Sequence, residues 1–128
     1  MIRQTLQRYQ NGKVLNRRIR TGAFVNMASR RTAFRVHGTV QGVGFRDFTQ
    51  KRAVEYGLKG WVKNTTCGKV EGEVQGNEET LQKFFKDIDK GPRLAHVVKL
   101  EKRDLSPEEG EDHFVVRRTS DSVFEATK

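Results

Sequence analysis

The stretch AFRVHGTVQGVGFRDF, residues 33–48, contains a change in hydrophobic period that decides the fold. Up to Val40, apolar residues alternate with polar ones, which is typical of a half-buried strand. After Gly42 and Gly44, the apolar residues take helical spacing that starts at Phe45 and continues until the next glycine supplies a C-terminal stop. The sequence therefore predicts a strand, a glycine loop and a helix in direct succession.

Three further strands, a second helix and a short terminal strand follow along the chain. Asn77 is placed to cap the second helix and Gly91 to end it, and Glu71 and Glu73 are expected to face outward from the strand before it. We expect these strands at residues 58–64, 70–75, 98–100 and 114–116, and a core made chiefly of Phe34, Val36, Val70, Val74, Phe84, Phe85 and Ile88. The order β-α-β-β-α-β predicts an α+β fold, the ferredoxin-like split βαβ sandwich, whose antiparallel sheet carries two helices on one face.

This topology has a consequence for residues that are distant in the sequence. A right-handed βαβ connection makes its two strands parallel, even when another strand lies between them. The first strand runs into the glycine loop at its carboxyl end, and the second strand ends at Asn64, just before the predicted turn TTCG at 65–68. We therefore expect residues 41–46 and Asn64 to be neighbours at one edge of the sheet.

The loop VQGVGFR, residues 40–46, combines three features that favour a bound anion. Gly42 and Gly44 allow a bend in which successive amides point inward. The loop leads into a helix N-terminus, whose free N–H groups and dipole favour negative charge. Arg46 adds a planar donor group that suits phosphate. The alternative interpretation is a flexible turn between strand and helix with a surface arginine.

Two motifs resemble signatures of the acylphosphatase family. The stretch GTVQGVGFR (38–46) is similar to the family pattern G-x-V-Q-G-V-x-F-R, and GLKGWVKN (57–64) is similar to its second signature. GPRLAHV (91–97) and FVVRRT (114–119) match weaker family features. The resemblance covers residues 32–119 and implies a ferredoxin-like fold. It also implies a hydrolase that cleaves the carboxyl–phosphate bond of acyl phosphates to a carboxylate and inorganic phosphate.

The resemblance implies roles for individual residues as well. Arg46 would bind the phosphoryl group, Asn64 would hold the attacking water, and Thr65 would support Asn64. Neither a metal ion nor a cofactor is expected. The small-molecule partner would be an acyl phosphate, and inorganic phosphate would be both product and competitive inhibitor. The phosphate oxygens would be bound by the main-chain amides of Gln41, Gly42, Val43, Gly44, Phe45 and Arg46.

The net charge of +9 is concentrated in the N-terminal part of the chain. Residues 1–31 hold eight of the 25 Lys and Arg residues and no acidic residue, whereas the remaining chain is nearly neutral. We therefore expect a basic extension (1–31), one domain (32–119) and a loose polar tail (120–128). The extension is disordered, a targeting segment, or translated sequence ahead of a start at Met27. The expected location is cytoplasmic, or mitochondrial if the extension is a transit peptide.

Other classes of protein fit the sequence less well. RNA-recognition domains share the topology but carry aromatic residues on the third strand, where this chain has the acidic stretch KVEGEVQ at 69–75, so no nucleic acid partner is expected. No apolar run approaches the roughly 20 residues that a membrane-spanning helix needs. Cys67 is the single cysteine and is interpreted as incidental. A monomer is the default expectation. The alternative function is a non-catalytic ferredoxin-like domain that binds anions or serves a partner, although binding alone does not need Asn64.

Overall fold

The computed structural model describes residues 17–18, 24–25 and 29–126 of the 128-residue chain. Two short strands, β1 (Arg17–Arg18) and β2 (Phe24–Val25), pair with each other. Most of the predicted extension, including Met27, lies outside the described residues. The domain that follows consists of β3 (Arg30–Thr39), α1 (Phe45–Glu55), β4 (Lys59–Asn64), β5 (Val70–Gly76), α2 (Glu78–Lys90), β6 (His96–Leu105), β7 (Phe114–Val116) and the 3₁₀ turn η1 (Phe124–Ala126).

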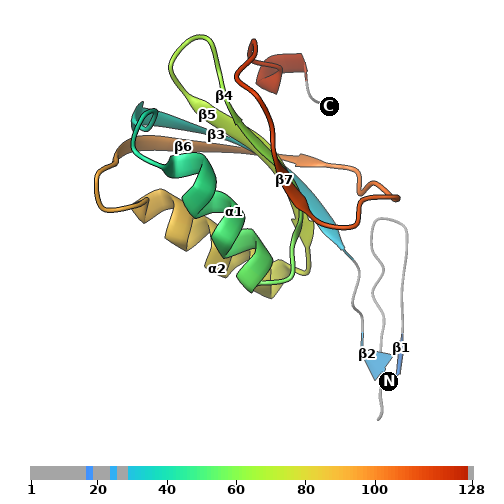
Figure 1. Cartoon of the computed structure of the whole chain (residues 1–128). Coiled ribbons are helices and arrows are strands. Elements are labelled where there is room, and N and C mark those ends of the chain that lie inside the picture. Colours follow the sequence, from blue (N-terminus) through green and yellow to red (C-terminus); the bar gives the residue numbers. More distant parts are fainter. Residues whose placement is uncertain (1–16, 19–23, 26–28, 127–128) are drawn as a thin grey trace.

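A five-stranded sheet with the order β6-β3-β5-β4-β7 forms one layer, and α1 and α2 cover one of its faces (Figure 1). Strands β6, β3, β5 and β4 pair antiparallel with their neighbours in that order, so the ferredoxin-like α+β fold predicted from the sequence is confirmed. The terminal strand β7 pairs parallel with β4, which makes the complete sheet mixed. Strands β3 and β4 run in the same direction on either side of β5, as the right-handed connection requires.

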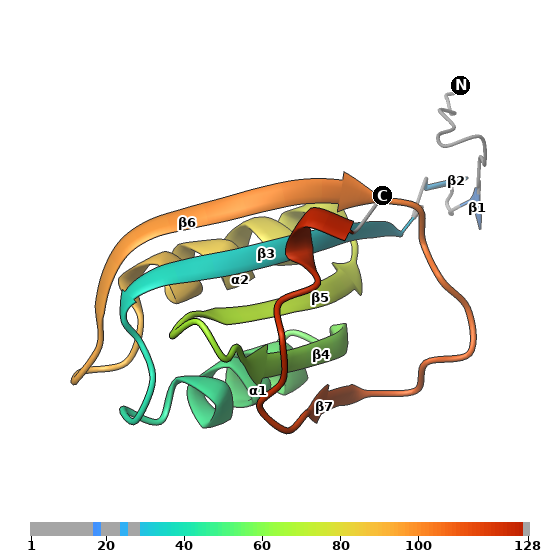
Figure 2. The same cartoon turned by 90° about the horizontal axis from the view of Figure 1, so that it is seen from above.

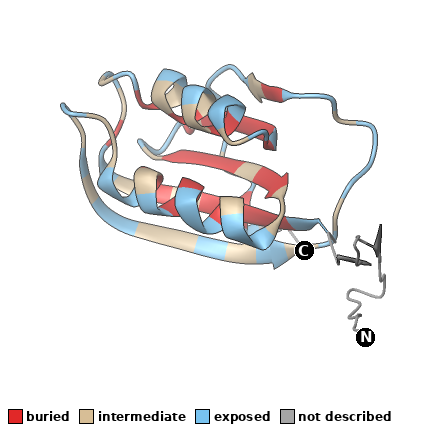
Figure 3. Ribbon diagram, turned by 90° about the horizontal axis from the view of Figure 1, so that it is seen from below, coloured by how far each residue is buried: buried red, intermediate tan, exposed pale blue. Residues whose placement is uncertain are grey.

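The core lies between the sheet and the helices (Figure 3). Phe34 at the centre of β3 is fully buried, and its ring centroid lies 5.8 Å from those of both Phe84 and Phe85 in α2, in edge-on geometry. Gly72 is the partner of Phe34 on β5, and a Cβ there would lie only 2.8 Å from the Phe34 ring. The absence of a side chain at Gly72 therefore makes room for this aromatic cluster. All seven predicted core residues are buried.

The ends of both helices follow the predicted local chemistry. Asn77 caps α2, because its side chain accepts a hydrogen bond from the amide of Thr80 at 2.9 Å. Gly57 follows α1 with a φ of 71°, and its amide bonds to the carbonyl of Val54.

None of the helical segments among residues 29–126 combines the length and the apolar character that a membrane crossing requires.

The chain after β7 packs across the face of the sheet opposite the helices, called the open face below. In Figure 2, this segment crosses β4 and β5 toward β3, with the helices behind the sheet. Phe124 is 7% exposed and lies between the guanidinium groups of Arg35 and Arg103, whose Cζ atoms are 4.6 and 5.0 Å from its ring centroid. The expectation of a loose tail is therefore wrong for residues 120–126.

The buried charged side chains on the open face include Glu71 and Arg31, whose burial the alternating pattern did not predict. Glu71 is 1% exposed, because Ser122 and Val123 cover it and donate hydrogen bonds of 2.6 and 2.8 Å to its carboxylate. Arg31 is also 1% exposed, and its guanidinium pairs with Glu73 and Glu111. The expectation that Glu71 faces solvent is wrong. Arg31, counted above with the basic extension, is part of β3.

A third charged group on the open face makes the stability of the fold depend on pH. Glu101 Oε1 lies 2.7 Å from His37 Nε2 and accepts a hydrogen bond from Arg35 Nε at 2.9 Å. These bonds, that of His37 first, lower the pKa of Glu101 from 4.5 to about 2. The carboxylate therefore stabilises the folded chain fully above pH 4.5, and this contribution is lost as the pH falls from 4.5 toward 2.

The substitution Glu101→Gln tests this contribution. The free energy of unfolding should be lower than that of the wild type at pH 6, and the difference should shrink steadily as the pH falls toward 2.5 in denaturant titrations. Glu109→Gln, at an exposed acid in the loop before β7, is the control and should give no such trend. A difference for Glu101→Gln that is the same at pH 6 and pH 2.5 would contradict the assignment.

Candidate active site

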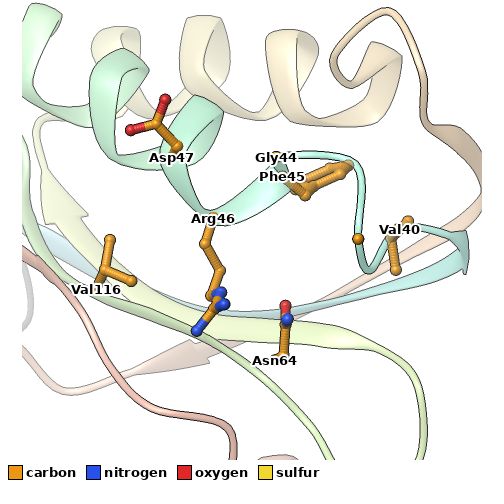
Figure 4. Close-up of a pocket in the computed structure, with 8 residues that line it drawn as sticks. Val40, Gly44, Phe45, Arg46, Asp47, Asn64 and Val116 are labelled. Atoms are coloured by element: carbon orange, nitrogen blue, oxygen red, sulfur yellow. The ribbon is translucent and has the colours of Figure 1, made fainter.

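A pocket of about 330 Å³ opens at the edge of the sheet where β3 and β4 end (Figure 4). The glycine loop forms one side and the end of β4 the other, so the neighbourhood predicted from topology is present. Arg46 and Asn64 both point into the space between these two sides (Figure 4). The residues that line the pocket are Val40, Gly42, Gly44, Phe45, Arg46, Asp47, Asn64 and Val116.

The loop depends on glycine for its backbone conformation rather than for space. Gly42 and Gly44 have φ values of 75° and 77°, in the left-handed region that other residues avoid. An added Cβ would meet no protein atom within 4 Å at either position. The space beside both glycines is therefore open, and a ligand can approach the main chain closely.

The amides of this loop are free to bind a ligand. Among the described residues, the main-chain N–H groups of residues 41–47 have no protein acceptor, whereas the amide of Phe48 already bonds to the carbonyl of Gly44. Gly44 is the N-cap of α1 and provides no side chain to satisfy the first turn. The unpaired donors and the helix dipole together make this end of α1 a binding position for an anion.

Gln41 holds the loop against the turn that follows β4. Its side-chain Nε2 donates hydrogen bonds to the carbonyls of Thr65 and Lys69, at 2.7 and 2.9 Å. Neither Gln41 nor Val43 lines the pocket, and Val43 packs against the core instead. Of the six loop residues predicted to bind phosphate, the structure thus brings Gly42, Gly44, Phe45 and Arg46 to the pocket wall.

Arg46 is fixed by a contact to the chain after β7. Its Nη1 donates a hydrogen bond of 3.2 Å to the carbonyl of Arg117. The amide of Arg117 in turn donates to the carbonyl of Val62 on β4 at 2.8 Å. In the described part of the chain, no carboxylate pairs with the Arg46 guanidinium, so most of its donors remain available in the pocket.

Asn64 presents a polar atom that the protein itself does not satisfy. Its Oδ1 is buried and has no hydrogen-bond partner among the described residues. A buried amide oxygen without a donor is costly, and such orphaned groups occur where a water molecule or ligand binds. The carboxamide of Asn64 is therefore suited to hold a small polar molecule on the side of the pocket that faces Arg46 (Figure 4).

Thr65 has partners other than the side chain of Asn64. Its Oγ1 accepts a hydrogen bond from the amide of Lys69 at 2.9 Å and lies 3.2 Å from the Lys69 carbonyl. The same hydroxyl lies 3.3 Å from Sγ of Cys67. Thr65 therefore closes the turn between β4 and β5, and any support that it gives to Asn64 passes through the backbone.

The sequence did not identify every residue at the pocket. Val116 lines it from β7 and is 40% exposed, and the carbonyl of Arg117 holds Arg46. The closing stretch FVVRRT contains both residues, but a main-chain contact to Arg46 leaves no sequence signal. Asp47 lies at the rim and pairs with Lys51 on the exposed side of α1. Among the described residues, no three His, Cys, Asp or Glu side chains are grouped to hold a metal ion.

Alanine at position 44 should weaken anion binding beyond its effect on stability. The left-handed backbone at Gly44 would cost an alanine about 1 kcal/mol, and relief of that strain would turn the loop amides away from the pocket. Gly110→Ala is the matched control, because Gly110 has a φ of 95° and open space around it but lies in the loop before β7.

Isothermal titration with inorganic phosphate measures the difference. Both variants should lose similar stability, and only Gly44→Ala should show a clearly raised Kd for phosphate. Equal affinities in the two variants would show that the conformation of the loop is not what binds the anion.

Comparisons with known proteins show the family of this chain. The family model described as Acylphosphatase matches residues 32–116. A protein named Acylphosphatase from Geobacillus kaustophilus is 50% identical over 76 residues, which cover 58% of this chain and 81% of the relative. The crystal structure of acylphosphatase from Bacillus subtilis has a TM-score of 0.67 and 35% identity, and the match covers 69% of this chain and 98% of that one. A structure of an acylphosphatase from Coxiella burnetii has a TM-score of 0.66 at 32% identity, over 70% of this chain and 93% of that one. The chain therefore belongs to the acylphosphatase family.

Proposed function

We propose that this chain is a hydrolase that cleaves acyl phosphates to a carboxylate and inorganic phosphate. The observation that supports this function most strongly is the pairing, in one pocket, of free loop amides beside Arg46 with the unsatisfied carboxamide of Asn64. The loop amides and Arg46 suit a phosphoryl group, and the carboxamide of Asn64 suits a water molecule next to it. A domain that only bound anions would need the first group and not the second.

The phosphoryl group would bind where the loop amides and the helix dipole converge. The amides of Gly42, Gly44, Phe45 and Arg46 would donate to its oxygens, and the guanidinium of Arg46 would add a bidentate contact. Negative charge on these oxygens increases or redistributes in the transition state, so donors that are already oriented lower the barrier. The bond from Arg46 to the Arg117 carbonyl keeps the guanidinium oriented before substrate arrives.

Asn64 would hold the attacking water through the oxygen of its carboxamide. The water oxygen attacks phosphorus in line with the bond to the acyl oxygen, and that bond breaks as the new one forms. Because an amide is too weak a base to accept a proton, the proton of the water passes to a phosphoryl oxygen. Asn64 then acts by position, and it need not ionise.

The leaving group needs no acid catalyst. A carboxylate is the conjugate base of an acid with a pKa of about 4, so it leaves without protonation near neutral pH. Among the described residues that line the pocket, Asp47 is the one acid, and it pairs with Lys51 on the exposed side of α1. The product phosphate should occupy the same cradle and compete with substrate.

We also propose that the chain acts as a monomer and that it does so in the cytoplasm.

Arg46→Lys should abolish most activity although the positive charge is kept. A single ammonium cannot reproduce the planar pair of donors, nor can it bond to the Arg117 carbonyl and to phosphate in the same geometry. With benzoyl phosphate as substrate, we expect kcat/KM to fall by roughly 100-fold or more, and phosphate inhibition to weaken as well. Lys51→Arg, on the exposed side of α1, is the control. Near-normal kcat/KM in Arg46→Lys would show that charge alone suffices.

Asn64→Ala should separate binding from turnover. Removal of the carboxamide deprives the water of its position, so kcat should fall by roughly 100-fold. The competitive Ki of inorganic phosphate should stay within about twofold of the wild type, because the loop amides and Arg46 are unchanged. If the purified variant hydrolysed benzoyl phosphate at the wild-type rate, the water-holding role of Asn64 would be wrong. If the wild type itself failed to hydrolyse it, the accessory binding function would be favoured instead.

A further inference from the structure

The segment of residues 120–126 completes the edge of β4 at the position of Asn64. Strand β7 pairs with β4 only as far as Val62, which is opposite Val116. Beyond that point, the outer edge of β4 is covered by Ser120. The amide of Ser120 donates to the carbonyl of Asn64 at 3.2 Å, and the amide of Thr66 donates to the carbonyl of Ser120 at 3.1 Å. The backbone of Asn64 is therefore held on one side by β5 and on the other by this segment.

Side chains next to Asn64 depend on the same segment. Lys63 Nζ donates to Ser120 Oγ at 2.8 Å and to the carbonyl of Asp121 at 2.7 Å. Thr66 Oγ1 donates to the carboxylate of Asp121 at 2.7 Å. The residues on both sides of the Asn64–Thr65 pair thus bond to two consecutive residues of the segment, which limits the movement of the β4 end.

A buried ion pair fixes the segment on the sheet. The side chains of Lys63 and Glu71 are 7% and 2% exposed, and Lys63 Nζ lies 3.8 Å from Glu71 Oε2. Ser122 and Val123 supply the donors that satisfy the Glu71 carboxylate. A buried ion pair needs such additional hydrogen bonds to offset the desolvation of both charges. The segment is therefore tied to β4, whose end lines the pocket, and to the neighbouring strand β5.

The end of the segment is anchored at β3. Phe124 is enclosed between Arg35 and Arg103, and Glu125 pairs with Arg35 at 2.7 Å. Strand β5 separates this anchor on β3 from Asn64 on β4, so the segment crosses the open face as a strap (Figure 2). Residues 120–126 are called the strap below.

We propose that the strap is a positioning device for Asn64, an inference that rests on the proposed function of the pocket. The Asn64 side chain has no bond from its oxygen to any described residue, so its orientation depends on where its backbone lies. The strap fixes that backbone, and Ser120 is the positioning residue because its N–H reaches the Asn64 carbonyl. Arg46 is held separately by Arg117, which precedes the strap. Loosening the strap should thus impair the water position and spare the phosphate cradle.

The substitution Ser120→Pro removes the N–H that bonds to Asn64, together with the hydroxyl that accepts a hydrogen bond from Lys63, and so tests the proposal directly. Thr119→Pro is the matched control, since it introduces the same ring one residue earlier without removing a hydrogen bond to any described residue. In Ser120→Pro, kcat for benzoyl phosphate should fall roughly 10-fold or more, with the Ki of inorganic phosphate within about twofold of the wild type. In Thr119→Pro, both should stay close to the wild-type values.

A second comparison separates positioning from stability. Leu81→Ala in the buried face of α2 lowers stability without touching the strap, and its kcat should match the wild type at temperatures where it is folded. Phe124→Ala releases the strap anchor within the full chain and should reproduce the loss of kcat if Ser120→Pro does not fold. The loss of kcat in Phe124→Ala should exceed that in Leu81→Ala when the two variants are compared at the same folded fraction.

The outcomes are decisive in either direction. A selective loss of kcat in Ser120→Pro or Phe124→Ala, with phosphate affinity kept, supports the strap as a positioning device. Unchanged kcat in a folded variant, or equal losses of kcat and phosphate affinity, overturns it. Failure of the proposed function is recognised separately, because the wild type would then show no hydrolysis in the same assay.

Discussion

The parallel course of β3 and β4 on either side of β5 is the constraint on which the pocket depends. It brings the carboxyl ends of both strands to one edge of the sheet. The glycine loop leaves one strand and the β4–β5 turn leaves the other, so anion donors and a carboxamide meet there without being near in sequence. Gln41 then joins the two loops through the carbonyls of Thr65 and Lys69.

Polar groups without a partner gather at this edge, whereas buried charges on the open face are satisfied. Among the described residues, the loop amides and Asn64 Oδ1 have no hydrogen-bond partner, but the buried charges of Arg31 and Glu71 are paired and hydrogen-bonded. Unpaired donors beside a pocket cost little in the free protein, since water reaches them, and they are worth more once a ligand excludes that water. The aromatic core around Phe34 packs β3, which leads into the loop, against α2.

The sequence predicted what depends on periodicity and connection rules. The two helices, the four main strands, the core and the nearness of Asn64 to the loop followed from those rules. The packing of residues 120–126 did not, because Val123 and Phe124 form only a short apolar pair in a polar stretch, and the partners of Phe124, Arg35 and Arg103, are charged. Glu71 was expected to face solvent because strand alternation assigns a residue only to one face of the sheet. Whether another segment covers that face depends on the tertiary fold. The hydrogen bond from Arg46 to the Arg117 carbonyl could not be predicted either, because every residue has a main-chain carbonyl.

We infer that free loop amides, Arg46 and Asn64 form one site for a phosphoryl group and its water. A ¹⁵N NMR titration of the full chain with inorganic phosphate tests this inference. We expect saturable shifts of the amides of residues 42–46, the Arg46 Nε–H and the Asn64 side-chain amide, all with a single Kd that equals the kinetic Ki. Saturable shifts confined to other residues, or separate Kd values for Arg46 and Asn64, would contradict it.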